Sequence, residues 1–397
     1  MGIMTLIRDF SFEGMPRLLF GPGSLSRLPE LVSNSGTRVL LITGWEWFQE
    51  SGRCESLIAA LRSSGLEVFR FRVRGEPAPS TVDYATREFG DAGIDAVVAV
   101  GGGAVIDAAK AISAMLPLKQ PVKPYLEGVG TRKHPGVKKP LIAVPTTAGT
   151  GAEATKNAVL SEIGPEGFKK SLRHNHFIPD VALLDPDLTL DCPREVTAAC
   201  GMDALTQLIE SYVSTGATPL TDALAWEGLK SIVPNLIEVC SEGSCSPERR
   251  GRMLYGSFLS GVTLAHAGLG VVHGFASPIG GLFEIPHGIV CGTLLSPCTR
   301  VTVGNLLRSP EDGTGTIGKY ARIGRLFSGT PDQSSDDACR SLVGTLQEWT
   351  DLLRIPKLGQ FGVDEVNLEP IVQGTALKNN PARLTREQLL EILRERL

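Results

Sequence analysis

The feature that most constrains the fold is an alternation, in the first half of the chain, between short β-rich runs and longer amphipathic stretches. The clearest short runs span residues 38–43, 67–73, 96–100 and 141–144. Between them, residues 53–64 and 81–92 have helical spacing and end near glycine. Alternation of this kind predicts βαβ units, in which helices cover a parallel sheet.

The pattern changes past about residue 190. From there the chain shows long helical patterns, at residues 195–213, 219–239, 247–266 and 342–353, and almost no strand-like runs. Two stretches rich in Ser, Gly and Thr, 309–316 and 328–337, are expected to be surface loops within this half. The fold class predicted is therefore α/β plus all-α, with an α/β domain that contains a parallel sheet at residues 1–188 and a helical domain at residues 189–397.

Composition narrows the possible partners. The chain has 397 residues and a formal net charge of −4, with Lys and Arg scattered rather than massed. A nucleic-acid-binding protein needs a concentrated basic surface, so we expect no nucleic-acid partner. Small polar ligands are favoured instead.

Export and membrane signals are missing from the sequence pattern. Residues 1–16 carry Arg8, Asp9 and Glu13 and no continuous apolar stretch, so we expect no signal peptide. The most apolar region, 268–283, contains His273 and ends before Glu284, short of the ~18 apolar residues of a membrane helix. Eight cysteines form no CxxC pair and no framework spacing, which indicates reduced thiols. We therefore expect a cytoplasmic protein with no membrane partner.

A glycine run follows one of the predicted strands. Gly101, Gly102 and Gly103 come directly after the run at 96–100, and a helical pattern opens at Ala104. Glycines let the backbone approach a pyrophosphate, and the amides and dipole of the helix N-terminus attract negative charge. The alternative is a tight turn between strand and helix that binds nothing.

A second loop has the same placement. Residues 145–155 (PTTAGTGAEAT) follow the run at 141–144, and they concentrate hydroxyls and glycines at the carboxyl end of a strand. Such a loop suits hydrogen bonding to ribose and phosphate oxygens. Because two loops of this type are expected at one edge of the sheet, we predict that they converge on one nucleotide.

Candidate metal ligands occur in the second half. Asp203 and Gln207 are spaced i, i+4 on a predicted helix, so their side chains share a face. His273 and His287 follow later, with Pro286 placing His287 just beyond a helix end. Together they form a mixed oxygen and nitrogen set that suits zinc or divalent iron. Each histidine taken alone could equally be a hydrogen-bonded core residue.

Five motifs in order resemble the iron-containing, or group III, alcohol dehydrogenases, relatives in fold of glycerol dehydrogenase and dehydroquinate synthase. Residues 20–23 (FGPG) resemble the family's N-terminal hairpin, 101–110 its GGGSxxDxxK element, and 145–155 its PTTxGTGSE loop. Residues 201–210 resemble GMDALTHxxE, and 273–288 resemble HxxxH…PHG. The resemblance spans the chain and implies a dinucleotide-binding α/β domain followed by a helical domain, with the active site between them.

The resemblance also implies functional residues. Gly101, Gly102, Gly103 and Ala104 are expected to bind the pyrophosphate of NAD(P), and Thr146, Thr147 and Thr150 its adenosine and ribose side. Asp107 matches an aspartate near the nicotinamide half, and Lys169 a lysine that reaches the cofactor ribose. Asp203, His273 and His287 match catalytic metal ligands.

The metal motif departs from the family at two positions. Gln207 stands where the family usually has a histidine ligand, and an amide oxygen is a weaker donor to zinc or iron than imidazole. Ser277 stands where many members have a further histidine near the substrate, so a proton relay there needs the serine, a ribose hydroxyl or water. Some relatives work without metal, which keeps a metal-independent reductase open.

A third departure concerns the cofactor. Gly44 stands at the end of the first predicted strand, where many members have an aspartate that binds the adenosine ribose and repels a 2′-phosphate. Losing that carboxylate predicts that NADP is accepted. Glu46, two residues on, could restore the exclusion.

These observations predict a metal-dependent, NAD(P)-linked alcohol dehydrogenase or aldehyde reductase acting on a small molecule. We also expect a homo-oligomer, with a dimer as the simplest form, but no sequence pattern marks its interface. Asp203, His273 and His287, assisted by Gln207, would hold iron or zinc.

Three alternatives remain. One is a reductase of a charged keto acid or aldehyde, of the maleylacetate or phosphonoacetaldehyde type, with Arg173, His174 and His176 as anion contacts. Another is a lyase of the dehydroquinate synthase type, and the third is a nucleotide-binding protein without activity. The GMDALT and PHG elements disfavour the lyase, and retention of Asp203, His273 and His287 disfavours the inactive protein.

Overall fold

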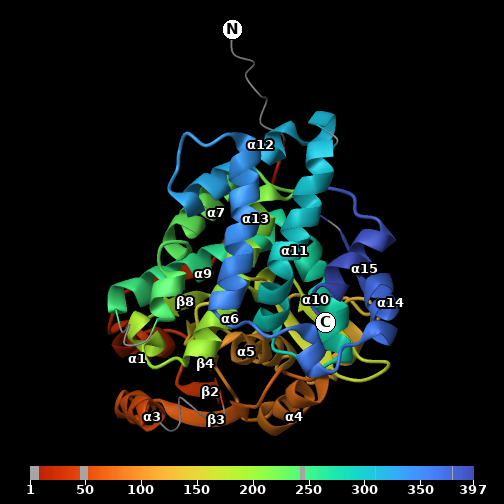
Figure 1. Ribbon diagram of the computed structural model, residues 1–397. Helices are drawn as coiled ribbons and strands as arrows, with labels where there is room; N and C mark the ends of the chain where they lie inside the picture. The colour runs from red at the N-terminus through yellow and green to blue at the C-terminus, as the bar shows by residue number, and fades with distance from the viewer. Residues whose placement is uncertain (1–8, 45–51, 242–245, 309, 378) are drawn as a thin grey trace.

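The computed structural model describes residues 9–44, 52–241, 246–308, 310–377 and 379–397, with the side chains of 310–314 outside the description. Six strands form a parallel sheet in the order β1-β8-β5-β4-β2-β3 (Figure 1). Their bounds are β1 Arg17–Phe20, β2 Arg38–Gly44, β3 Glu67–Val73, β4 Ala96–Gly101, β5 Leu141–Pro145 and β8 Val181–Leu184. The predicted parallel sheet is confirmed.

Helices cover both faces of the sheet, because successive side chains of a strand point to opposite faces. Val39 and Leu41 of β2 pack with α1 (Leu28–Ser33) and α3 (Arg53–Ser63). Leu40 and Ile42 of the same strand pack with α4 (Pro79–Phe89) and α5 (Gly103–Met115). All four of these β2 side chains are buried, which explains the continuous apolar run that predicted the strand.

Two parts of the α/β half differ from the prediction. A separate antiparallel pair, β6 (Asn157–Glu162) and β7 (Phe168–Arg173), was missed because its strands are half polar and bring Lys169 and Lys170 into a β-run. The predicted hairpin at residues 20–23 is wrong, since β1 pairs in parallel with the distant β8. Short 3-10 turns complete this half at Ser24–Arg27, Lys123–Tyr125, Ala152–Ala154 (η3), Asn175–Phe177 (η4) and Pro186–Thr189.

The second half is helical, as predicted, and no described residue after β8 lies in a strand. Its helices are α6 Arg194–Val213, α7 Pro219–Ile232, α8 Leu236–Val239, α9 Pro247–Ala267, α10 Val271–Leu282, α11 His287–Arg308, α12 Pro310–Ser328, α13 Ser335–Leu352, α14 Glu365–Gly374 and α15 Arg386–Arg394, with a 3-10 turn at Leu358–Phe361. The predicted fold class is therefore confirmed.

Proline residues explain two differences between the predicted and the observed helix bounds in this half. The pattern at 219–239 predicted one helix, but Pro234 separates α7 from α8, because proline cannot continue the backbone ladder. The predicted loop at 309–316 is wrong, because α12 begins at Pro310. Proline is favourable in the first turn of a helix, where its missing N–H has no intrahelical partner.

The two halves pack closely. Leu254, Phe258 and Val262 of α9 are buried against Ala182 and Leu184 of β8, and the later helices lie together on the same side of the sheet region in Figure 1. Among the described residues, no single helix is long and apolar enough to cross a membrane. By length and composition alone α9 and α10 pass together, although they are bent by 96°.

Candidate active site

The two predicted nucleotide loops meet at the carboxyl ends of neighbouring strands. Gly101 at the end of β4 is paired with Pro145 at the end of β5, and the Thr146 N–H donates to the Gly101 carbonyl at 3.0 Å. A Cβ placed on Gly103 would lie 2.5 Å from Thr150 Oγ1, and one on Gly102 would lie 3.3 Å from Thr147 Oγ1. Only glycine allows the loops to approach so closely.

Helix α5 opens at this point with Gly102 as its N-cap residue and no side-chain cap. The first N–H groups of an α-helix lack intrahelical partners, so the turn that contains Gly103 and Ala104 offers donors to an anion. Gly44 ends β2, the other strand beside β4. The arrangement suits a dinucleotide lying across these strand ends. The predicted exclusion by Glu46 lies outside the described residues.

Two predicted cofactor residues have protein partners of their own. The carboxylate of Asp107 lies 2.9 Å from the buried Lys110 ammonium and accepts the Val159 N–H at 3.1 Å, so it joins α5 to β6. Lys169 Nζ lies 2.9 Å from Glu76 Oε2, and its chain packs against Gly280 of α10. Cofactor contacts by Asp107 and Lys169 therefore remain predictions.

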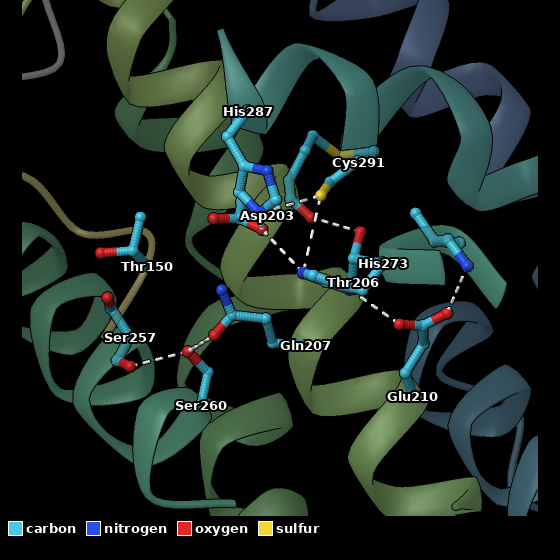
Figure 2. Close-up of polar contacts among 12 residues, drawn as sticks. Thr150, Asp203, Thr206, Gln207, Glu210, Ser257, Ser260, His273, His287 and Cys291 are labelled. Carbon is cyan, nitrogen blue, oxygen red and sulfur yellow. Dashed lines mark hydrogen bonds and ion pairs between the residues drawn. The ribbon is translucent and has the colours of Figure 1, made fainter. Parts of the chain in front are cut away.

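The predicted catalytic residues come together from three helices (Figure 2). Asp203 lies on α6, His273 in the first turn of α10, and His287 is the first residue of α11. Asp203 Oδ1 lies 3.4 Å from His273 Nε2 and 3.8 Å from His287 Nε2. Cys291 Sγ joins them, so that one donor atom from each of the four residues lies within 4.8 Å of the others.

Glu210 fixes the orientation of His273. Its Oε2 lies 2.7 Å from His273 Nδ1, and its Oε1 accepts the Val272 N–H at 2.7 Å (Figure 2). With Nδ1 donating to the carboxylate, Nε2 faces Asp203. Carboxylates placed in this way behind a histidine hold the ring and make it a better metal ligand.

The charges in the cluster are set by burial and mutual contact. Burial raises the pKa of Asp203, but His287 and His273 outweigh this effect and hold that pKa at about 2. Burial lowers the pKa of His287 to about 4, so this imidazole is neutral near pH 7. Burial also acts against a charged His273, but contacts with Cys291, Asp203 and Glu210 raise its pKa well above the ordinary value. Metal binding would displace the His273 proton.

The two departures from the family motif are both hydrogen-bonded. Gln207 is buried, and its Oε1 accepts the Ser260 hydroxyl at 2.9 Å (Figure 2). Ser277 donates its hydroxyl to the Lys169 carbonyl at 3.1 Å, which joins α10 to β7. A role for Gln207 as a metal ligand therefore remains a prediction. The Ser277 hydroxyl proton points to a backbone carbonyl.

The residues proposed for a charged substrate have other partners. Arg173 pairs with Glu127 at 2.9 Å. The His174 ring accepts the His176 N–H, and the His176 ring contacts the Gly136 carbonyl at 3.1 Å. None of these contacts involves the cluster, so they give no support to an anion site beside it.

Sequence reasoning missed Glu210 and Cys291 as members of the site. Glu210 stood inside a quoted motif, seven residues after Asp203, which puts it two turns along the same helix. Cys291 is four residues after His287, and the i, i+4 rule that paired Asp203 with Gln207 applies equally to this pair. The spacing therefore could have identified Cys291, but all eight cysteines were interpreted together as reduced core or surface thiols.

A divalent metal fits these residues. Both carboxylate oxygens of Asp203 are buried and have no hydrogen-bond partner, in a side chain that is 1% exposed. An unsatisfied buried carboxylate is costly, and a cation placed among the four donors would satisfy it. The donors include two imidazoles, a carboxylate and a thiol, which transition metals of this class bind.

The chain matches known proteins along its whole length. The family model for iron-containing alcohol dehydrogenase matches residues 16–186, and the C-terminal model of that family matches 197–397. The NAD-dependent methanol dehydrogenase of Bacillus methanolicus is 30% identical over 96% of this chain and 98% of its own. The sulfoacetaldehyde reductase of Bilophila wadsworthia is 28% identical, over 95% and 96%.

A solved structure agrees. A crystal structure of 1,3-propanediol oxidoreductase superposes with a TM-score of 0.85 at 30% identity, covering 98% of this chain and all of that one. The predicted oxidoreductase class, acting on CH–OH groups with a nicotinamide cofactor, is confirmed by these relatives. The chain belongs to the family of iron-containing alcohol dehydrogenases.

Proposed function

We propose that this protein is a metal-dependent, NAD(P)-linked dehydrogenase that interconverts a small uncharged alcohol and its aldehyde. In this proposal Asp203, His273 and His287 hold the metal, and Gln207, one turn after Asp203 on α6, assists them. The observation that carries the proposal is the buried Asp203 carboxylate. Neither of its oxygens has a hydrogen-bond partner, and Oδ1 lies 3.4 and 3.8 Å from the Nε2 atoms of His273 and His287. The relatives support the same chemistry, since they include a methanol dehydrogenase.

The bound groups supply the reaction chemistry: the metal acts as a Lewis acid, and the nicotinamide accepts or donates hydride. The protein supplies position and charge. Glu210 holds the His273 ring, Asp203 balances positive charge in the site, and the loops at Gly101–Gly103 and Thr146–Thr150 bind the dinucleotide. Because the Ser277 hydroxyl donates to a carbonyl, we expect the alcohol proton to leave through a ribose hydroxyl or water instead.

Several finer parts of the proposal rest on single features. NADP is accepted because Gly44 carries no charge to repel a 2′-phosphate. The enzyme works in the cytoplasm, where seven cysteines that are free in the described structure would stay reduced. It functions as a homodimer, which analytical ultracentrifugation would test.

The test is to follow nicotinamide absorbance after chelator-treated enzyme is mixed with a panel of neutral and anionic aldehydes. Each aldehyde is tried with NADH and with NADPH, before and after addition of zinc, ferrous iron or nickel. We expect activity only with metal, and with the neutral aldehydes. Equal activity without metal would overturn the proposal, and preference for anionic substrates would favour the charged-aldehyde alternative.

A further inference from the structure

The thiol of Cys291 lies among the predicted metal ligands but has no role in the function proposed above. Its residue is fully buried, and Sγ contacts His273 Nε2 at 3.6 Å and His287 Nε2 at 3.7 Å (Figure 2). These are the two nitrogens that face Asp203. The thiol is therefore the fourth donor in a cluster whose other three donors come from the predicted metal ligands, Asp203, His273 and His287.

The spacing of the four donors matches a tetrahedral metal site. Bonds of about 2.3 Å to sulfur and 2.0–2.1 Å to nitrogen, at tetrahedral angles, separate a sulfur and a nitrogen donor by about 3.6 Å and a nitrogen and an oxygen donor by about 3.4 Å. The sulfur–nitrogen separations here are 3.6 and 3.7 Å, and the nitrogen–oxygen separations are 3.4 and 3.8 Å. The chain alone thus sets these donors near metal-binding positions.

Two local features keep the donors in place. Cys291 is one helical turn after His287 on α11, so both side chains emerge from the same face. The Glu210 carboxylate holds the His273 ring from behind. By contrast, the Gln207 oxygen, at the position where the resemblance implies a fourth ligand, accepts the Ser260 hydroxyl. Because the Cys291 sulfur contacts both histidines while the Gln207 oxygen is bonded to Ser260, sulfur is favoured over the amide as the fourth donor.

We propose that Cys291 Sγ is a protein ligand of the catalytic metal, and that this thiolate makes the site select zinc rather than iron. The inference deepens the proposed function and rests on it. Thiolate is a softer donor than imidazole, and soft donors favour zinc over ferrous iron at mixed sites. Metal binding releases the proton of a thiol ligand, so with a metal bound Cys291 and Asp203 would bring two negative charges to a divalent cation.

The decisive test is the absorption spectrum of the protein loaded with cobalt(II) in place of the native metal. A thiolate ligand gives a charge-transfer band in the near ultraviolet, and tetrahedral cobalt gives visible bands. We expect both in the wild-type protein. Cys291→Ser should lose the ultraviolet band and keep visible bands, while Cys298→Ser, a buried cysteine two turns along the same helix, should keep both.

A competition titration adds a second readout. Zinc and ferrous iron are offered together to the metal-free protein under anaerobic conditions, and bound metal is measured. Loss of an outer-shell partner of a ligand already costs about 10–100-fold in metal affinity, so Cys291→Ser should lower the zinc affinity by at least about tenfold. The share of zinc in the bound metal should fall with it, because the thiolate is the donor that favours zinc. Gln207→Ala should leave the ultraviolet band unchanged, because the amide is not the fourth donor.

The outcomes separate the inference from the proposed function. Metal-dependent activity in a wild-type protein whose cobalt form lacks the ultraviolet band, or a band that survives Cys291→Ser, would overturn the sulfur ligand alone. Loss of the band in Gln207→Ala with retention in Cys291→Ser would also overturn it. A wild-type protein that binds no cobalt and needs no metal would overturn both proposals together.

Discussion

The nucleotide region and the metal region of this molecule are built in opposite ways. The nucleotide region consists of backbone: Gly101–Gly103 and the loop after β5 approach each other because side chains are missing. The metal region consists of carboxylate, imidazole and thiol side chains, buried or half-buried, that are brought together from α6, α10 and α11. The difference teaches that one region depends on chain conformation and the other on tertiary packing.

Each region also contains a buried carboxylate, and the two are shifted in opposite directions. Two imidazoles hold the pKa of Asp203 at about 2. Burial raises the pKa of Glu153, in η3 of the loop after β5, to about 7, and its Oε1 has no hydrogen-bond partner. A buried carboxylate is thus held in its charged form in one region, while burial favours the protonated form in the other.

The largest expected effect breaks the metal region alone. His287→Ala should lower kcat by about 1000-fold or more, since Lewis-acid stabilisation is worth several kcal/mol. The Kd for NADH, measured by fluorescence titration, should stay within about twofold. His176→Ala, whose ring contacts the Gly136 carbonyl outside the cluster, is the control and should keep activity. Normal turnover in His287→Ala would remove the metal-centred mechanism.

The second effect concerns the contrasting carboxylate, Glu153. Because its folded-state pKa of about 7 lies above the ordinary 4.5, the folded protein binds more protons between these values. Its contribution to the unfolding free energy should therefore fall by about 3 kcal/mol as pH rises from 4.5 to above 7. In urea unfolding, the free energy of unfolding of Glu153→Gln should therefore rise relative to that of the wild type as the pH increases over this range. Glu348→Gln, at an exposed position, is the control. The prediction would be contradicted if the unfolding free energies of the wild type and both variants had the same dependence on pH.

The third effect breaks the nucleotide region alone. Gly103→Ala puts a Cβ where it meets Thr150 Oγ1 at 2.5 Å, so the two loops must separate. Overpacking of this kind costs about 1–3 kcal/mol, and the Kd for NADH should rise by about tenfold or more. Bound metal per chain should not change. Gly344→Ala, in α13 with open space around it, makes the same substitution without a clash and should bind NADH normally.

The smallest effect sharpens the account of the nucleotide region. Gly44→Asp should reduce the ratio of kcat/KM for NADPH to that for NADH by about tenfold, because a carboxylate repels the 2′-phosphate. A Cβ at Gly44 meets only Val105, at an ordinary 3.7 Å, so the side chain fits. Gly44→Asn is the neutral control and should keep more NADPH activity. An unchanged ratio in the aspartate variant would mean that Gly44 does not face the ribose.

The sequence could predict the features that depend on local chain conformation better than those that depend on tertiary packing. The strands β2, β3, β4 and β5 and the glycine loop after β4 could be predicted because each is a local pattern of apolar runs and turn residues. The parallel partner of β1 could not, because β8 lies far along the chain from β1. The neighbouring strands β6 and β7 were missed because both are half polar and lack a continuous apolar run. The loop expected at 309–316 was wrong because Ser, Gly and Thr content outweighed the helix-starting role of Pro310.

The metal region was only partly predictable. Asp203, His273 and His287 followed from motifs, but their meeting point is a product of packing among three helices. Helical spacing puts Cys291 on the same face as His287, but the 3.6 and 2.7 Å distances from Cys291 and Glu210 to His273 join different helices and depend on packing. The nucleotide contacts of Asp107 and Lys169 remain predictions, since both side chains pair within the protein.

The contact between Gly151 and Gly261 has a consequence for thermodynamic linkage. A Cβ on Gly261 would lie 2.1 Å from the Gly151 carbonyl oxygen, so the loop after β5 rests directly on the backbone of α9. The same helix carries Ser260, which binds Gln207 one turn from Asp203. If nucleotide binding shifts this loop, the contact gives a direct route to α9 and so to Gln207. Any resulting change in metal affinity would be matched by an equal factor in cofactor affinity.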